Sequence, residues 1–284
     1  MSSIGFPFAK MQAVGNDFVV LEETDLPADT EWSRLAIELC HRRFGVGADG
    51  LMLIEASATA DLRMRMFNPD GTEDMCGNGM RCVLHRAHET GKLGDTGTIE
   101  TIAGIRPFTR HTDGSITTAM GKPQFDPTHL PMQTAQNPVL DYPIAVGDEV
   151  LPVSVVSTGS LHTVVFVEEL PGDDRFFRLS PLLENAPVFP ERTSVMWTQV
   201  EAKNRLRLRI WERGVGETLG CGTGASAAAV LARTQGKVAG NGTVTVSSAG
   251  GELRVEWEEP GSEVYLTGYA QTVFTGTWIS THHD

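Results

Sequence analysis

The chain repeats itself at an offset of about half its length, and this duplication constrains its fold more than any other feature. Four pairs of segments recur in the same order, 144 or 145 residues apart. The pairs are 14–20 with 158–165, 62–71 with 206–214, 76–79 with 221–224, and 97–101 with 242–246. Because a chain of 284 residues holds only two copies of such a unit, the sequence predicts two related domains and not a solenoid.

Each copy has the pattern of a mixed α+β unit. Alternating apolar residues predict strands at 62–67, 115–120, 206–211, 243–247 and 253–257. Helical spacing predicts helices over 30–43 and after each Cys-Gly-x-Gly segment. Hairpins are expected at 106–120 and 253–268, and the proline-rich stretch 121–152 marks the boundary between the halves.

Composition excludes several classes of partner. The chain has 36 acidic and 23 basic residues, a net charge of −13, which repels nucleic acid and anionic membranes. Its 40% apolar content supports a globular core, and its four cysteines are too few for a disulfide scaffold of this size. With no signal peptide or spanning segment in view, we expect a cytoplasmic protein with reduced thiols.

The two Cys-Gly-x-Gly segments carry the chemical signal. Cys76–Gly79 and Cys221–Gly224 each stand at the entrance to a predicted helix. A helix N-terminus binds carboxylates and lowers the pKa of a nearby thiol. Related by a pseudo-two-fold axis, the two thiols would face one cleft, and one would remove a proton while the other donates to the opposite face.

The cysteines also have other interpretations. A single cysteine at a helix start is more often buried packing than a base, but its occurrence in both copies favours catalysis. Cys40 and Cys82 lack equivalents and are assigned to core or helix contacts. Cys82, His85 and His88 would fan out around one helix, so we expect no metal site, and no nucleotide-binding motif is present.

The segments 9–18, 43–50, 67–82 and 211–225 resemble the diaminopimelate epimerase family, and the matches span nearly the whole chain in order. The resemblance implies two pseudo-symmetric domains, each a mostly antiparallel sheet wrapped around a central helix, with the active site between them. We expect residues 1–121 with 265–284 to form one domain and 122–264 the other. The resemblance further implies epimerisation of LL-2,6-diaminopimelate to the meso form, without a cofactor, in lysine and peptidoglycan biosynthesis, and allows a homodimer.

The resemblance also implies roles for individual residues. Cys76 and Cys221 would be the acid and base, His162 would tune a cysteine, and Glu212 would lie by the α-amino group. The substrate-binding set would comprise Asn16, Asn68, Arg213, Ser160, Ser194 and the backbone N–H groups of Gly77, Asn78, Gly222 and Thr223. Two purely structural roles are the alternatives. Asn68 would only begin the turn 68–71, and Glu212 with Arg213 would form a solvated strand end.

Two positions depart from the family pattern. Ser160 and Ser194 stand where the family typically has asparagines that bind the distal end of the substrate, and serine lacks the second amide function. A related racemase or epimerase of another amino acid is therefore the alternative function. A non-catalytic binding protein and an isomerase that uses one carboxylate were also considered, and the cysteine in both copies disfavours each.

Overall fold

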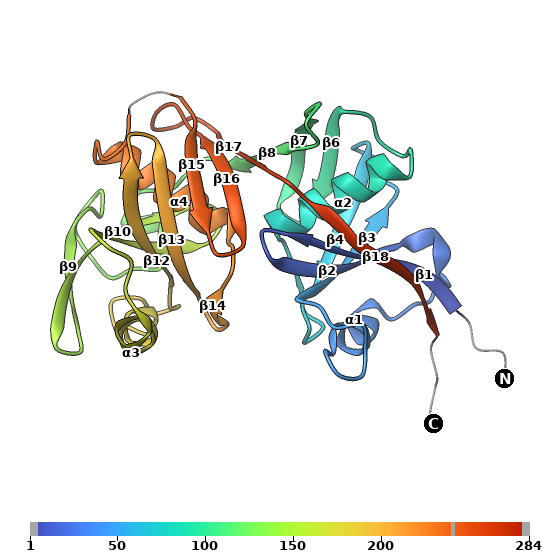
Figure 1. The fold of residues 1–284 in the computed structure, drawn as a ribbon, viewed down its shortest axis with the longest axis horizontal. Coiled ribbons are helices and arrows are strands. Elements are labelled where there is room, and N and C mark those ends of the chain that lie inside the picture. The colour runs from blue at the N-terminus through green and yellow to red at the C-terminus, as the bar shows by residue number, and fades with distance from the viewer. Residues whose placement is uncertain (1–4, 240–241, 280–284) are drawn as a thin grey trace. The chain divides into compact units, whose positions relative to one another are not determined.

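The computed structural model describes residues 5–239 and 242–279, which divide into two compact units (Figure 1). Unit 1 comprises the residues up to Thr118 and those from Gly268 on, and unit 2 is Ala119–Thr267. The chain passes between the units at 118/119 and 267/268, where the sequence predicts 121/122 and 264/265. Both crossings lie inside strands, β8 (Ile116–Gly121) and β17 (Val264–Gly268). The sequence therefore has no loop-like composition that would indicate these boundaries. In these ranges no helix is long and apolar enough to cross a membrane.

Unit 1 is a mostly antiparallel sheet. Its strands pair in the order β18-β1-β2-β3-β4-β6-β7-β8, with parallel pairs at β2–β3 and β4–β6, and the two-residue β5 adds to β4. The bounds are β1 Gly5–Ala13, β2 Asn16–Glu22, β3 Gly50–Glu55, β4 Leu62–Phe67, β5 Glu73–Asp74, β6 Thr96–Thr101, β7 Gly104–Arg110 and β18 Gln271–Ile279.

Unit 2 repeats this topology. Its order is β9-β10-β11-β12-β13-β15-β16-β17, with parallel pairs at β11–β12 and β13–β15, and β14 adds to β13. The bounds are β9 Tyr142–Val146, β10 Glu149–Ser157, β11 Leu161–Val167, β12 Ser194–Ala202, β13 Arg205–Glu212, β14 Gly216–Thr218, β15 Val244–Ser248 and β16 Gly251–Glu256. The predicted duplication, fold class and both hairpins are thereby confirmed.

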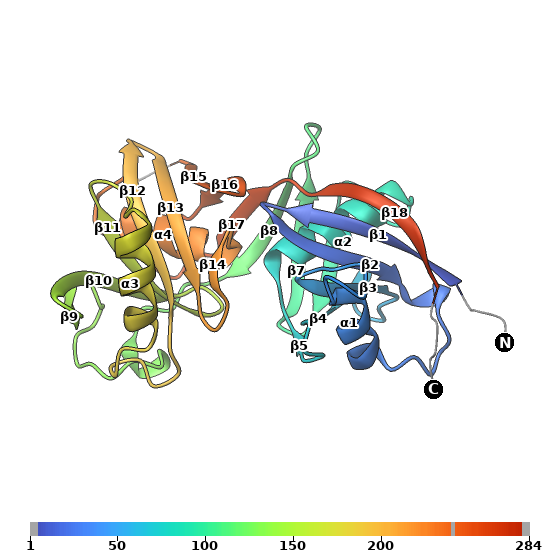
Figure 2. The same cartoon turned by 60° about the horizontal axis from the view of Figure 1, so that its bottom comes forward.

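Each sheet separates two helices. In unit 1, Phe18 and Val20 of β2 pack with α2 (Gly77–Glu89), whereas Val19 and Leu21 face α1 (Trp32–Cys40). Figures 1 and 2 show these helices on opposite faces of the sheet. The corresponding helices in unit 2 are α4 (Gly222–Thr234) and α3 (Asp173–Glu184), and two short 3-10 turns lie at Glu23–Asp25 and Pro127–His129. Helices α2 and α4 are each buried along most of their length, as a central helix must be.

Two local expectations need correction. The helix predicted over 30–43 spans only Trp32–Cys40, because the following loop folds back on its last turn. There Gly47 N–H donates to the Leu39 carbonyl at 2.9 Å, and a Cβ on Gly45 would lie 2.1 Å from the Glu38 carbonyl oxygen. The proline-rich stretch 121–152 belongs to unit 2, where it forms the β9–β10 hairpin and buries Val139 in the core.

Candidate active site

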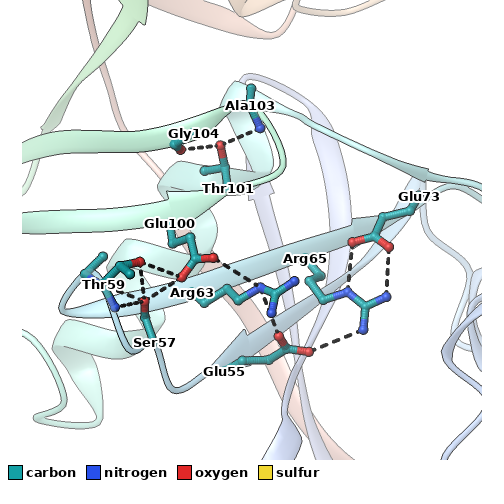
Figure 3. Close-up of polar contacts among 11 residues, drawn as sticks. Glu55, Ser57, Thr59, Arg63, Arg65, Glu73, Glu100, Thr101, Ala103 and Gly104 are labelled. Atoms are coloured by element: carbon teal, nitrogen blue, oxygen red, sulfur yellow. Dashed lines mark hydrogen bonds and ion pairs between the residues drawn. The ribbon is translucent and has the colours of Figure 1, made fainter.

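A short hairpin delivers the chain to each cysteine. In unit 1, Arg65 on β4 binds Glu73 on β5 through two hydrogen bonds of 2.8 Å, and Glu55 lies 3.6 Å from the same guanidinium (Figure 3). In unit 2, Arg209 on β13 binds Glu217 on β14 at 2.8 Å, at positions 144 residues further along. The duplicated ion pair holds each hairpin closed just ahead of the cysteine-bearing helix.

Cys76 and Cys221 occupy the same place in the two units. Each is the N-cap of its helix, with an extended backbone (φ −133°, ψ 119° and φ −132°, ψ 115°). The N–H groups of the next two residues lie in the first turn: Gly77, Asn78, Gly222 and Thr223. First-turn N–H groups have no intrahelical acceptor and are directed to the N-terminal end, where they can bind a carboxylate.

The last glycine of each motif has a different role from the one expected. The motif predicts that both glycines allow a sharp backbone turn and close approach of a ligand. A Cβ on Gly79 would lie 2.6 Å from the sulfur of Met52, and one on Gly224 would lie 2.5 Å from the sulfur of Met196. This glycine therefore lets the central helix pack against a methionine of the sheet.

Asn16 joins the Cys76 thiol to a charged cluster. The thiol donates to Asn16 Oδ1 at 3.6 Å, and Asn78 Nδ2 donates to the same oxygen at 3.4 Å. Asn16 Nδ2 donates to Asp49 Oδ2 at 2.6 Å. Because a carboxylate accepts hydrogen bonds, Asp49 fixes the orientation of the Asn16 amide and turns its oxygen to the thiol.

Asp49 is itself held by charged neighbours. Arg42 bridges Asp49 at 2.6 Å and Asp17 at 2.8 Å, and Lys10 binds Asp17 at 2.5 Å. Burial acts to raise the pKa of Asp17, but the hydrogen bonds from Arg42 and Lys10 outweigh it and bring the pKa down to about 2. This ion-pair cluster keeps the Asn16 amide in place.

In unit 2, Thr223 links Cys221 to His162. The His162 ring is 1% exposed, and its Nδ1 lies 2.7 Å from the Ser160 carbonyl oxygen, which can only accept. Nδ1 therefore carries the proton, and Nε2 accepts from Thr223 Oγ1 at 3.2 Å. The Thr223 hydroxyl oxygen in turn lies 3.4 Å from Cys221 Sγ, so a continuous chain runs from thiol to imidazole.

The protonation of this chain follows from burial. Desolvation lowers the pKa of His162 to about 4, so the ring is neutral at neutral pH. Burial, and then the Glu212 carboxylate, raise the pKa of Cys221 well above its usual value, although Thr223 and the Gly224 N–H act to lower it. The position of each cysteine at a helix terminus predicts a thiolate. At Cys221 burial is the larger effect, and the group is a thiol.

The remaining predicted residues divide between the units. Glu212 accepts from Thr218 Oγ1 at 2.6 Å. Ser194 Oγ accepts from the Arg213 N–H at 3.1 Å, and the Arg213 guanidinium donates to the Glu191 carbonyl at 3.1 Å. Asn68 begins the predicted turn and donates to Thr72 Oγ1 at 3.1 Å. Unit 1 thus brings Cys76, Asn16 and Asn78 together, and unit 2 does the same for Cys221, Thr223, His162 and Glu212.

The other cysteines and the neighbouring histidines lie apart from these two networks. Cys82 is buried in the core, while His85 and His88 turn to different carboxylates, Glu89 and Asp95, each at 3.3 Å. No cluster of metal-binding side chains occurs in ranges 5–239 and 242–279. Burial raises the pKa of both core thiols, that of Cys40 to about 12. A cavity of about 550 Å³ in unit 2 is lined by paired charges such as Arg205 and Glu252.

Sequence reasoning missed two residues of the unit 1 network. Asp49, which orients Asn16, and Arg81, which donates to Asn78 Oδ1, both lie inside the quoted segments and received no role. Arg81 carried a visible signal, because a helix that is buried on most sides offers little solvent-facing surface for a charge. Asp49 carried none, since its partner Asn16 is 33 residues away in the chain.

The duplicated fold and the cysteine that caps each central helix define an isomerase of the epimerase class, and known proteins agree. The family model for diaminopimelate epimerase matches residues 8–126 and 154–273. A diaminopimelate epimerase of Moorella thermoacetica is 44% identical over 95% of this chain and 98% of its own length. One from Desulforudis audaxviator is 43% identical over 96% and 99%. The chain belongs to the diaminopimelate epimerase family.

The fold extends to more distant proteins. A Bacillus anthracis phenazine biosynthesis protein of the PhzF family superposes with a TM-score of 0.74, at 21% identity, covering 99% of this chain and 100% of that one. At this identity the likeness concerns the fold alone.

Proposed function

We propose that this protein epimerises LL-2,6-diaminopimelate to the meso form without a cofactor, supplying lysine and peptidoglycan synthesis. The observation that carries the proposal is the repeated N-cap cysteine, once in each unit and each with its own polar network. Relatives of 44% and 43% identity that bear the name diaminopimelate epimerase support the substrate.

In the proposed reaction, the thiolate of Cys76 removes the α-proton and becomes a thiol, leaving the electron pair on the carbon and its carboxylate. The thiol of Cys221 donates its proton to the opposite face and becomes a thiolate. The substrate is inverted, no atom is gained or lost, and the two sulfurs have exchanged protonation states. The reverse direction uses the same groups with their roles exchanged.

The surroundings of Cys221 suit the donor role. Its raised pKa keeps the proton on sulfur until the carbanion forms and accepts it. The Gly224 N–H, 3.4 Å from the sulfur, then stabilises the thiolate that forms. His162 is the neutral acceptor at the end of the hydroxyl chain and holds Thr223 in one orientation. Glu212 lies by the substrate's α-amino group in this proposal, and the first-turn N–H groups hold the α-carboxylate.

The distal end of the substrate is assigned to Arg213, Ser160 and Ser194, and Asn16 and Asn68 are assigned to other hydrogen bonds with the substrate. The planar guanidinium of Arg213 suits the second carboxylate. Ser194 already accepts a hydrogen bond from the Arg213 backbone, so in this proposal it also supports the arginine. If the serines exclude diaminopimelate, the alternative is a racemase of another amino acid.

The test is exchange of the α-hydrogen in deuterated water under reducing conditions. We expect LL-diaminopimelate to gain one α-deuterium and yield the meso isomer, as read by mass spectrometry and chiral chromatography. Cys76→Ser and Cys221→Ser are matched controls that keep the size of the side chain and should lose turnover. Exchange with another amino acid but not with diaminopimelate would establish the alternative. No exchange with any amino acid would contradict both.

A cytoplasmic location, a homodimer, and the lack of nucleic-acid, membrane and metal partners stay predictions. Gel filtration with light scattering measures the oligomeric state of the purified protein directly.

A further inference from the structure

Arg81 places a positive charge in the middle of a hydrophobic core. It lies on α2, one turn beyond the Cys76 cap, and is 0% exposed among Met80, Cys82 and Leu84. Burying an ion costs several kcal/mol unless an opposite charge or a full set of hydrogen bonds compensates. An arginine keeps its proton even when buried, so the charge persists at all ordinary pH values.

The described protein gives this charge almost no compensation. Arg81 Nη2 donates to Asn78 Oδ1, but Nε and Nη1 have no hydrogen-bond partner within residues 5–239 and 242–279. No carboxylate in those ranges forms an ion pair with it, and the first turn of α2 contains no acidic residue. Burial lowers the pKa of Arg81, and the thiols of Cys82 and Cys76 act in the opposite direction.

The duplicated unit shows that the fold does not require this charge. The residue at the matching place in α4, 145 positions further on, is Ser226. It is 0% exposed, and its hydroxyl donates to the Gly222 carbonyl of the same helix at 2.9 Å. A central helix of the same topology therefore packs well with a small neutral side chain, and the cation is particular to the Cys76 side.

We infer that Arg81 is a positioning residue whose buried charge stabilises negative charge at the N-terminus of α2, namely the Cys76 thiolate and the bound α-carboxylate. The bond to Asn78 adds orientation, because the other end of that amide contacts Asn16 beside the thiol. The helix dipole acts in the same direction, and in a low-dielectric core the two effects reinforce each other. Stabilisation of the bound α-carboxylate rests on the proposed function, whereas stabilisation of the Cys76 thiolate does not.

Arg81→Met tests the inference, because methionine fills similar space without charge. The matched control is Arg86→Met on the same helix, where the guanidinium is partly exposed and 3.4 Å from Glu89. Iodoacetamide alkylation of Cys76 is followed from pH 5.5 to 9.5 by peptide mass mapping. In Arg81→Met we expect the midpoint at higher pH and alkylation about tenfold slower at pH 7. Arg86→Met should match the parent protein.

Thermal unfolding separates this role from a structural one. Replacing a buried uncompensated ion by an apolar side chain is often neutral or stabilising, so Arg81→Met should melt at the same temperature or higher. Arg81→Gln serves as a second neutral variant. An unchanged alkylation profile in a folded neutral variant would overturn the inference. So would failure of both neutral variants to fold, because the charge would then be maintaining the core.

Alkylation needs no substrate, so this outcome is independent of the proposed reaction. The protein could show a shifted pH profile of Cys76 alkylation in Arg81→Met and still not exchange the α-hydrogen of diaminopimelate. That result would support the role of Arg81 and contradict the proposed function. In an active protein, kcat/KM of Arg81→Met should fall about tenfold at pH 7 and recover as the pH rises.

Discussion

The neutral, buried His162 makes the stability of unit 2 depend on pH in a defined way. Burial lowers the pKa of this ring from 6.5 to about 4 in the folded state. Between these values the unfolded chain binds a proton that the folded chain does not, so stability falls as the pH falls. Above pH 6.5 both states are neutral and the effect vanishes, and below about pH 4 it reaches its limit.

The size of the effect follows from the two pKa values. A difference of 2.5 between 6.5 and about 4, at about 1.4 kcal/mol per unit, gives a limit of ~3 kcal/mol. At pH 5, part of the way down, the loss relative to pH 8 is about 2 kcal/mol. This is a large share of a typical stability of about 5–15 kcal/mol.

His162→Gln isolates this contribution, because glutamine can donate to Ser160 and accept from Thr223 but does not titrate. Protection of the β11 amides against hydrogen exchange, corrected for intrinsic rates, is measured at pH 8 and pH 5 in both proteins. We expect protection in the parent protein to fall about thirtyfold more than in the variant, the equivalent of 2 kcal/mol. An equal loss of protection in the two proteins would refute the argument. A His162 ring that titrates near pH 6.5 by NMR would then show that its pKa is not lowered in the folded state.

Three further substitutions have definite expected outcomes. Thr223→Val should lower the proposed epimerase rate at least about tenfold by breaking the hydroxyl chain, and Thr223→Ser should restore it, as measured by α-deuterium exchange. Gly79→Ala forces a methyl group against the Met52 sulfur and should cost unit 1 about 1–3 kcal/mol in urea unfolding; no loss would show that the methionine moves freely aside. Glu73→Gln weakens the partly buried pair with Arg65, and we expect a loss of about 1 kcal/mol by the same assay, which an unchanged midpoint would contradict.

Much of the fold follows from local pattern. The alternation at 62–67 and 206–211 produces strands β4 and β13, and both helices predicted after the Cys-Gly-x-Gly segments are present, although each begins three residues earlier, at Gly77 and Gly222. These features are visible because side-chain periodicity and backbone preference act over a few residues. The end of α1 was missed because it depends on the loop N–H of Gly47, which donates back to the Leu39 carbonyl of the helix, and loops of this kind leave no periodic signal.

The site was predictable only in part, for a related reason. Cys76, Cys221 and their first-turn neighbours belong to contiguous motifs, so their shared place at a helix cap can be read directly. The bond between Asn16 and Asp49 joins residues on different elements, and no local pattern announces it. The raised pKa of Cys221 was also missed, because it depends on burial and on Glu212, which only the folded chain brings to it.

The pairing of β18 with β1 has a consequence for biosynthesis. Strand β18 follows unit 2 in the chain, yet it completes the sheet of unit 1 along the whole of β1. During synthesis on the ribosome, β1 therefore lacks its β18 partner until residues 119–267 have been made. Unit 2, in contrast, has all its strands in one continuous stretch of sequence. Unit 2 can become protease-resistant on the nascent chain first, and the earlier-synthesised half matures last.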